Sequence, residues 1–363
     1  MVPKLGQARK DEHLDICLDA PVEAPAVSSL FEHVHLVHDA LPELSVDEVE
    51  LSTTVLGKAL DFPLVILGMT GGTERARQIN RDLALAAQRR RVAFGVGSQR
   101  AMADDPSLAT TFAVRDVAPD ALLFGNIGAQ QLATLGVDRV RDLVDRLGAD
   151  AIFVHLNAAQ ELAQPEGDRD FRGCLSAIAR LCGALGEKVW VKETGCGLSP
   201  SVARKLIGAG VGGLDISGAG GTSFTRVESL RATGARRVLG ETFSGWGIPT
   251  AAAVASCADL GVPLVASGGL RTGLDLAKAL ALGATLGGMA LPLLRAQAVG
   301  GPEGAEAALA EVELGLRAAM LLTGSRSIAD LRRKPRVLTG DLPRWVEILE
   351  ERRVPAGRGA ESV

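Results

Sequence analysis

Residues 155–168, HLNAAQELAQPEGD, place many polar side chains directly after an apolar run. His155, Asn157 and Gln160 can donate or accept hydrogen bonds, and Glu161 offers a carboxylate to a hard divalent ion such as Mg²⁺. One carboxylate is few for an all-protein metal site, but Mg²⁺ usually completes its shell with waters and phosphate oxygens. The segment therefore predicts either a metal that arrives with a diphosphate or a solvated loop with a helix cap.

Lys192 is a second candidate because it closes the apolar run KVWVK at residues 188–192. An ammonium group in such surroundings is costly unless it has a partner. An electron-rich ring or a phosphate would serve as that partner. A pair with Glu193 or Asp215 is an equally good alternative.

Eight short apolar runs, separated by helical segments rich in Ala, Leu and Arg, are the elements that must position these groups. They span residues 64–68, 92–96, 121–125, 151–155, 188–192, 212–216, 263–267 and 285–289. Continuous apolar strands joined by helices are typical of a parallel sheet in an α/β protein. Eight of them favour a closed (β/α)8 TIM barrel over an open doubly wound sheet, although periodicity alone does not show closure.

Polar motifs follow these strands, where a barrel carries its catalytic groups. They are MTGGTE (69–74), GSQR (97–100), NIGAQ (126–130), SGAGGTSF (217–224) and SGGLRTG (267–273). Glycine-rich turns that enter helices suit a phosphate, and barrels often bind phosphate after strands seven and eight, where Arg271 and residues 288–290 lie. The alternative is that these glycines only permit tight turns.

The remaining segments complete the predicted organisation. Residues 1–60 form an N-terminal extension packed on the barrel, residues 61–345 form the barrel, and residues 346–363 form a C-terminal tail. We expect one helix at residues 303–323, which makes the C-terminal segment helical. Residues 279–294 are uncharged but contain glycines and a proline, so they predict a helix end and a buried strand, not a membrane span. The charged run RKDEHLD (9–15) could reach an anion through Arg9 and Lys10, although terminal charge runs are usually solvated.

The composition excludes several classes of function. The 363 residues contain 39 basic and 43 acidic side chains, so the net charge of −4 gives no general attraction to nucleic acid or anionic membranes. The five cysteines form no CxxC pair, which disfavours a disulfide framework or a zinc site. The first residues lack the apolar core of a signal peptide, which predicts a cytoplasmic protein.

Taken in order, the motifs resemble those of the type 2 isopentenyl diphosphate isomerases, a flavin-dependent family. They are RKDEH (9–13), MTGG (69–72), GSQR (97–100), HLN with QE and QPEGD (155–168), VKE (191–193), GGTS (220–223), GWGIPT (245–250) and SGGLRTGLDLAKALALGA (267–284). Each motif alone is weak, but the ordered set covers most of the chain and is specific.

The resemblance implies a barrel that binds FMN, uses its reduced form, takes NAD(P)H as reductant and needs Mg²⁺ to interconvert isopentenyl and dimethylallyl diphosphates. It implies a homo-oligomer of four or eight copies. It assigns FMN to Met69, Thr70, Gly71, Ser98, Asn126, Lys192, Thr222, Gly269, Leu270, Arg271, Met289 and Ala290. It assigns the prenyl diphosphate to Arg9, Lys10, Ser98, Gln99, Arg100, His155, Asn157 and Gln160, the metal to Glu161, and catalytic roles to His155, Gln160 and Lys192.

This chain departs from the family pattern at two places. Ala158 and Ala159 stand where members often have Pro-Leu, which predicts a less rigid loop, and Gly245 stands where an acid often precedes the tryptophan. The competing hypothesis is an FMN-dependent oxidoreductase of the 2-hydroxy-acid oxidase type, which would use a strand-end histidine as base. His155 fits that role, but all five histidines lie at or before residue 155, and the late barrel strands carry none.

Overall fold

The eight apolar runs form a closed barrel of parallel strands in the computed structural model, which describes residues 5–24 and 26–351. Around the barrel the strands are β4 (Leu64–Ile66), β5 (Ala93–Gly95), β6 (Leu123–Gly128), β7 (Ala151–Leu156), β8 (Val189–Glu193), β9 (Gly213–Asp215), β10 (Leu264–Ser267) and β11 (Leu286–Met289). The barrel closes between β11 and β4, where Gly288 pairs with Val65. The predicted TIM barrel is confirmed.

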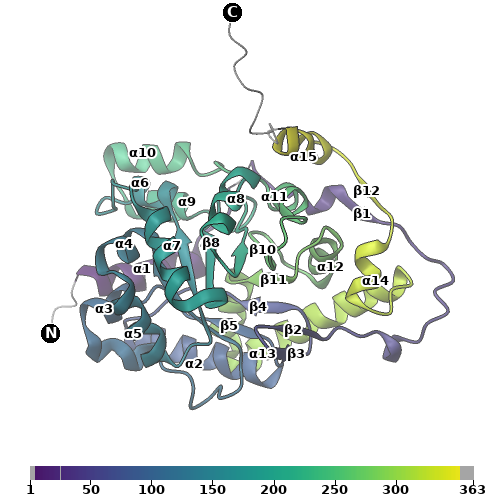
Figure 1. The fold of residues 1–363 in the computed structure, drawn as a ribbon, viewed down its shortest axis with the longest axis horizontal. Coiled ribbons are helices and arrows are strands. Elements are labelled where there is room, and N and C mark those ends of the chain that lie inside the picture. The colour runs from purple at the N-terminus through teal and green to yellow at the C-terminus, as the bar shows by residue number, and fades with distance from the viewer. Residues whose placement is uncertain (1–4, 25, 352–363) are drawn as a thin grey trace, which may run out of the picture.

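Helices surround the strands (Figure 1). They are α2 (Glu74–Arg89), α3 (Arg100–Asp104), α4 (Ala129–Leu135), α5 (Val137–Leu147), α6 (Ala158–Ala163), α7 (Cys174–Leu185), α8 (Pro200–Gly208), α9 (Phe224–Arg231), α10 (Gly234–Thr242), α11 (Thr250–Cys257), α12 (Gly273–Ala281) and α13 (Leu291–Leu322). Thr73, Ser223 and Thr272 accept hydrogen bonds from the first turns of α2, α9 and α12. Such caps contribute about 1 kcal/mol each and fix where the strand-to-helix loops end.

The barrel interior is filled by apolar side chains that alternate with outward-facing ones along each strand. Phe124, Phe153 and Trp190 pack against one another in its centre, with ring centroids 4.4–6.1 Å apart. Trp190 also fills the space beside Gly213, where a Cβ atom would lie 2.5 Å from the indole ring. This layer closes the barrel, so a ligand can enter only from one end.

A layer of polar side chains lies on the same inward face of β6 to β10, two residues beyond the apolar layer. Asn126, His155, Lys192, Asp215 and Ser267 follow one another on neighbouring strands. We call these five residues the polar layer. The corresponding positions on β4, β5 and β11 are Leu67, Gly95 and Gly288. The barrel mouth is therefore polar on one side and apolar or open on the other.

The N-terminal segment contacts the barrel through its first helix. Helix α1 (Leu5–Asp19) lies against α9 and α13, which brings Arg9 and Lys10 to the cavity at the strand ends. The hairpin of β2 (Thr53–Val55) and β3 (Lys58–Leu60) precedes the first barrel strand. His35 lies in β1 (Val34–Leu36), and its ring lies 3.0 Å from the Thr339 hydroxyl. His33 ends the short 3-10 helix that precedes this strand, and its ring also lies near Thr339 (3.3 Å).

The C-terminal segment returns to this N-terminal strand. The predicted helix at 303–323 is the second half of α13, which is interrupted by non-helical backbone at Gly300 and Gly301. After α14 (Ile328–Arg333), β12 (Arg336–Leu338) pairs with β1, and α15 (Leu342–Glu351) packs against α11 (Figure 1). Helix α15 runs across the proposed boundary at residue 345/346, and residues 352–363 of the tail lie outside the described residues.

Residues 279–294 form the end of α12, strand β11 and the start of α13, as the glycines in this stretch predicted. Among residues 5–24 and 26–351, no helix combines the length and the apolar character that crossing a membrane requires.

Candidate active site

One cavity opens at the carboxyl ends of the strands, beneath α1. Eighteen of the residues selected from the sequence line it: Arg9, Lys10, Met69, Thr70, Ser98, Arg100, Asn126, His155, Asn157, Gln160, Glu161, Lys192, Thr222, Gly269, Leu270, Arg271, Met289 and Ala290. Residues more than 280 positions apart in the chain thus share one site.

Gln99 and Gly71 do not line this cavity, contrary to expectation. The Gln99 side chain is fully buried; its amide nitrogen donates to the Leu143 carbonyl (3.1 Å), and its amide oxygen accepts the Asn126 backbone N–H (3.0 Å). Gln99 therefore supports the strand-end position of Asn126 rather than contacting a ligand. Gly71 is pressed against Phe112, whose ring would lie 1.9 Å from a Cβ atom at this position.

Asn126 and His155 form one contact of the polar layer. The His155 Nδ1 atom lies 2.8 Å from the Asn126 side-chain oxygen, so Nδ1 carries the proton and donates it. Burial and, to a smaller extent, the charge of the neighbouring Lys192 together lower the pKa of His155 to about 3. The imidazole is therefore neutral at pH 7, and its Nε2 atom is a hydrogen-bond acceptor.

Lys192 has few protein partners although it is buried. Its Nζ atom donates to the Glu193 backbone oxygen (2.5 Å) and lies 4.0 Å from Asp215 Oδ2. An ammonium group has three N–H donors, so it can still bind a ligand atom in the cavity. The sequence left open whether Lys192 binds a ligand or pairs with an acid. Both can hold, because the ammonium group can lie beside Asp215 and still donate to a ligand atom.

Glu193 holds the loop after β8. Its Oε2 atom accepts the backbone N–H groups of Thr194 and Gly195 at 2.6 Å and also that of Cys196. Burial raises the pKa of Glu193 to about 7, although these amides and Lys192 oppose the shift. Thr194 and Gly195 line the cavity, so this carboxylate shapes the wall beside Lys192.

The loops after β9 and β10 approach each other so closely that only glycine fits. A Cβ atom at Gly268 would lie 2.1 Å from the Gly218 oxygen, and one at Gly269 would lie 2.6 Å from the Gly220 oxygen. Both glycines have φ above +90°. Arg271, which follows them, pairs with Glu23 at 3.0 Å and thereby ties the N-terminal segment to this loop. Tight packing and a phosphate-binding turn are therefore both consistent with these glycines.

Arg9, Lys10 and Arg100 form a cationic cluster in another part of the cavity wall. Lys10 donates to the Ser98 backbone oxygen (3.3 Å), and its Nζ atom lies 5.3 Å from the centre of the Phe112 ring. Burial, followed by the positive charges of Arg9 and Arg100, lowers the pKa of Lys10 to about 7. Three neighbouring cations repel one another when no anion is bound. Together they therefore form a binding site for a multiply charged anion.

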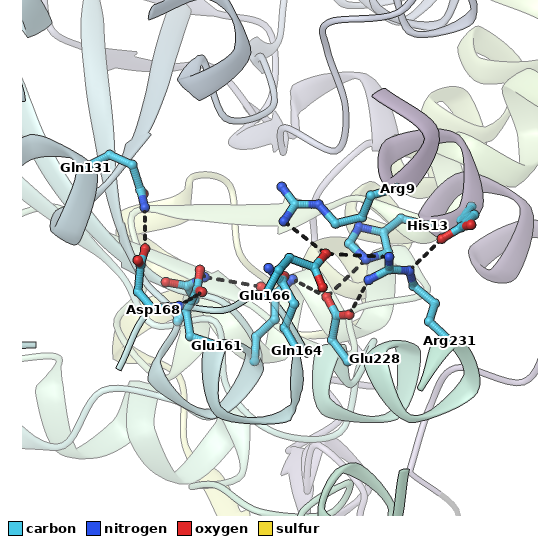
Figure 2. Close-up of polar contacts among 12 residues, drawn as sticks. Arg9, His13, Gln131, Glu161, Gln164, Glu166, Asp168, Glu228 and Arg231 are labelled. Carbon is cyan, nitrogen blue, oxygen red and sulfur yellow. Dashed lines mark hydrogen bonds and ion pairs between the residues drawn. The ribbon is translucent and has the colours of Figure 1, made fainter. Parts of the chain in front are cut away.

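A buried carboxylate joins α1, α6 and α9 beside this cluster (Figure 2). Glu228 accepts a hydrogen bond from Gln160 Nε2 (3.1 Å) and one from Arg231 (2.7 Å), and it lies 3.0 Å from His13 Nε2. Gln164, with its amide oriented to satisfy both neighbours, donates to Glu228 (3.1 Å) and accepts from Arg9 (2.7 Å). The orientation of Gln160 in the cavity is thus fixed by Glu228.

Glu161 lies next to Gln160 in α6. It is buried, and its two oxygens accept hydrogen bonds from Asn157 Nδ2 (2.8 Å) and from the Asp168 backbone N–H (2.7 Å). The Asp168 side chain in turn accepts from Gln131 (2.9 Å; Figure 2). Each carboxylate oxygen retains a free lone pair, and no group of three or more His, Cys, Asp or Glu side chains in the described chain could hold a metal without outside ligands.

Sequence reasoning missed several polar and aromatic residues that the structure brings to the cavity or its walls, among them His13, Gln131, Phe224 and Glu228. His13 could have been found, because it lies four residues after Arg9 and therefore on the same helix face. Glu228 carries no local signal, since it is one of many acids in a helix. Its role depends on the packing of α9 against α1 and α6.

Comparison with known proteins identifies relatives over nearly the whole chain. Isopentenyl-diphosphate delta-isomerase of Synechococcus sp. is 51% identical over 330 residues, which cover 90% of this chain and 94% of that protein. The enzymes of the same name from Methanosarcina barkeri and Pyrococcus abyssi are 45% and 44% identical, with at least 92% of each chain covered. The chain belongs to the isopentenyl-diphosphate delta-isomerase family.

This isopentenyl-diphosphate delta-isomerase family member also matches the family model of FMN-dependent dehydrogenases at residues 129–338. Solved structures with the same fold include a lactate oxidase described as putative from Pediococcus acidilactici (TM-score 0.66, 17% identity, 93% of this chain and 96% of that chain). A mandelate oxidase variant with an FMN adduct gives a TM-score of 0.63 at 19% identity, with 92% and 99% covered. At such identities this likeness shows the barrel fold of the isomerase family member and nothing about its activity.

Proposed function

We propose that this protein interconverts isopentenyl and dimethylallyl diphosphates with the help of reduced FMN and Mg²⁺. The observation that carries the proposal is the joint lining of one cavity by the Arg9, Lys10 and Arg100 cluster, the single carboxylate of Glu161 and the partly unpaired ammonium of Lys192. The names of relatives at 44–51% identity support the same assignment.

The residues at the barrel mouth fit FMN. Thr70 lines the cavity with a buried hydroxyl oxygen that has no hydrogen-bond partner, and Lys192 has donors to spare. We assign the ring to Met69, Thr70, Asn126 and Lys192, with Gly71 supporting this wall from behind. Ser98 lies between this wall and the Lys10 side chain, and we assign the phosphate to Thr222, Gly269, Leu270, Arg271, Met289 and Ala290. Reduced FMN supplies an acid and a base at its ring nitrogens when bound.

The cationic cluster would bind the diphosphate. Arg9, Lys10 and Arg100 place three positive groups on one wall, and Ser98 and His155 lie on the same cavity. Gln99 contributes only by supporting Asn126. Glu161 would bind the Mg²⁺ that the diphosphate brings, and the buried Asn157 Oδ1 atom, which has no partner, offers a second hard oxygen.

The reaction shifts a double bond by one carbon, so one proton is added and another is removed with no net oxidation. The chain must therefore keep water away from a carbon centre that develops positive charge. Leu14, Leu67, Met69, Phe224 and Leu294 provide apolar cavity wall. Gln160, oriented by Glu228, presents its side chain to the substrate, and Glu228 joins it to His13 and Arg231. A proton could be held and returned through this network.

A 2-hydroxy-acid oxidase is the second candidate, because the neutral His155 on the cavity wall is a possible base. However, the strands that follow β7 carry no histidine, and the cationic cluster would have no role with a monocarboxylate substrate. An NAD(P)H reductant, four or eight copies in the assembly and a cytoplasmic location remain parts of the proposal. They are supported by the family resemblance alone.

The test is an anaerobic assay with purified protein, FMN, a chemical reductant, Mg²⁺ and isopentenyl diphosphate. We expect dimethylallyl diphosphate to accumulate, and none to form without FMN. In parallel, lactate and mandelate should leave oxidised bound FMN unreduced. If lactate or mandelate reduces the bound flavin and no isomerisation is found, the isomerase proposal is wrong and the oxidase candidate is favoured.

A further inference from the structure

Asp215 is a buried acid with one oxygen that the protein leaves unpaired. Its side chain is completely enclosed, Oδ1 accepts from Ser267 Oγ (2.6 Å) and from the Ser217 backbone N–H (3.2 Å), and Oδ2 has no hydrogen-bond partner. Burying a carboxylate costs several kcal/mol unless another charge offsets it. A group of opposite charge is therefore expected near this carboxylate.

The nearest positive group to the unpaired oxygen is Lys192, whose Nζ atom lies 4.0 Å away. The two residues are register partners on β8 and β9, so their Cα positions are fixed by the barrel itself. Ser267 on β10 fixes the carboxylate from the other side. Burial raises the pKa of Asp215, whereas Lys192, Ser267 and the Ser217 amide favour its charged form.

The remaining titratable neighbours of Lys192 cannot replace this acid. His155 is neutral at pH 7 and offers no negative charge. The Glu193 carboxylate is turned toward the amides of residues 194–197, and only its backbone oxygen contacts Lys192. Asp215 is thus the one carboxylate in the polar layer that faces the ammonium group.

We propose that Asp215, held by Ser267, is a positioning residue that keeps the Lys192 ammonium group directed into the barrel mouth. It acts through Lys192 and does not itself line the cavity. Without it, the buried ammonium would have no nearby anion and would turn away from this position. The proposal rests on the proposed function in one respect, namely that FMN occupies the site beside Lys192.

The test compares Asp215→Asn, Lys192→Met and the double variant by the Kd values for oxidised and reduced FMN and by the midpoint potential of the bound flavin. A positive charge at the ring favours the reduced, more negative form. We expect D215N to lower the preference for reduced over oxidised FMN by about tenfold, or ~30 mV for two electrons. K192M should shift it further in the same direction, and the double variant should equal K192M.

Asp150→Asn is the matched control. It removes an acid that pairs with a lysine at the opposite end of the barrel, so it should lower Tm without moving the flavin potential. A merely structural role for Asp215 would likewise lower Tm only. Ser267→Ala should shift the potential as D215N does, but by less.

An unchanged or raised potential in D215N would overturn the proposal, because the carboxylate would then only enclose or offset the ammonium. Additive effects in the double variant would also overturn it, since Asp215 would then act on FMN directly. Wild-type protein that binds FMN without isomerising the substrate would refute the proposed function alone. Wild-type protein that binds no FMN would refute both.

Discussion

The barrel carries a lysine–aspartate pair at each end, and the two pairs are built differently. At the amino end, Lys58 Nζ donates to Asp150 Oδ2 (2.9 Å) and to the backbone oxygens of Asp120 (3.2 Å) and Ala121 (3.1 Å). All three of its donors are used. At the carboxyl end, Lys192 and Asp215 are 4.0 Å apart, and Asp215 Oδ2 accepts no hydrogen bond.

The pair with fewer hydrogen bonds is the more deeply buried of the two. The Lys58 and Asp150 side chains are 31% and 25% exposed, whereas those of Lys192 and Asp215 are 9% and 0% exposed. A partly exposed pair whose donors are all used stabilises the fold and has no capacity for a ligand. A buried pair with spare donors costs stability in the free protein and is explained when a ligand completes it.

The largest expected effect comes from exchanging the two lysines in turn for methionine. Lys192→Met should lower isomerase turnover by about 100-fold or more, because a preorganised charge in a water-excluded site is lost. Lys58→Met should leave turnover within about twofold and lower Tm instead. Steady-state kinetics and thermal unfolding of both variants check this contrast. Equal losses of turnover would show that the two pairs have the same role.

Glu161→Gln tests whether the carboxyl end also binds metal. We expect turnover to fall at least about tenfold and the Mg²⁺ concentration for half-maximal rate to rise, because an amide oxygen is a weaker ligand than a carboxylate. The affinity for FMN should stay unchanged, which separates this site from Lys192. Wild-type rates at equal Mg²⁺ concentration would contradict the metal role.

A smaller, pH-dependent effect is expected at Lys10. Its pKa of about 7 means that it is charged below pH 7 in the free protein and loses its charge as the pH rises. The KM for isopentenyl diphosphate should therefore rise several-fold between pH 6.5 and 8.5. In Lys10→Arg this rise should be smaller, because arginine keeps its charge. An identical pH profile in the two proteins would show that Lys10 does not contact the diphosphate.

The smallest effect is expected at the amino end, in Asp150→Asn. Burial raises the pKa of Asp150, but the Leu123 amide, Lys58 and Arg115 together lower it below its usual value. A lowered pKa stabilises the fold above about pH 4, and this contribution disappears as the pH falls. D150N should thus unfold a few degrees below wild type at pH 7 and approach it at pH 3. A constant Tm difference would contradict the ion pair.

The sequence predicts the fold well because a parallel barrel leaves a strong local signal. Each strand is a short apolar run that ends in glycine or polar residues, and all eight runs overlap the observed strands. The strand-end rule also brought Asn126, His155 and Lys192 to one cavity. Strand edges were less certain: β6 continues to Gly128 through the polar Asn126, so the predicted end at residue 125 was three residues early.

Other features depend on contacts that no local pattern encodes. Gln99 sits in a motif that points to a ligand, yet its side chain turns inward to support Asn126. Glu228 and Asp215 gain their roles from neighbours 68 and 52 positions away, Gln160 and Ser267. The pairing of β1 with β12, which joins both ends of the described chain, involves short edge strands that composition does not reveal.

The most direct test of the central claim is a turnover experiment in deuterated water under anaerobic conditions, with the bound FMN fully reduced at the start. We expect dimethylallyl diphosphate that carries deuterium from the solvent, while the flavin stays reduced and no reductant is consumed per turnover. Product free of deuterium, or a flavin that is oxidised once for each substrate converted, would contradict a proton-transfer isomerase and assign this barrel to redox chemistry.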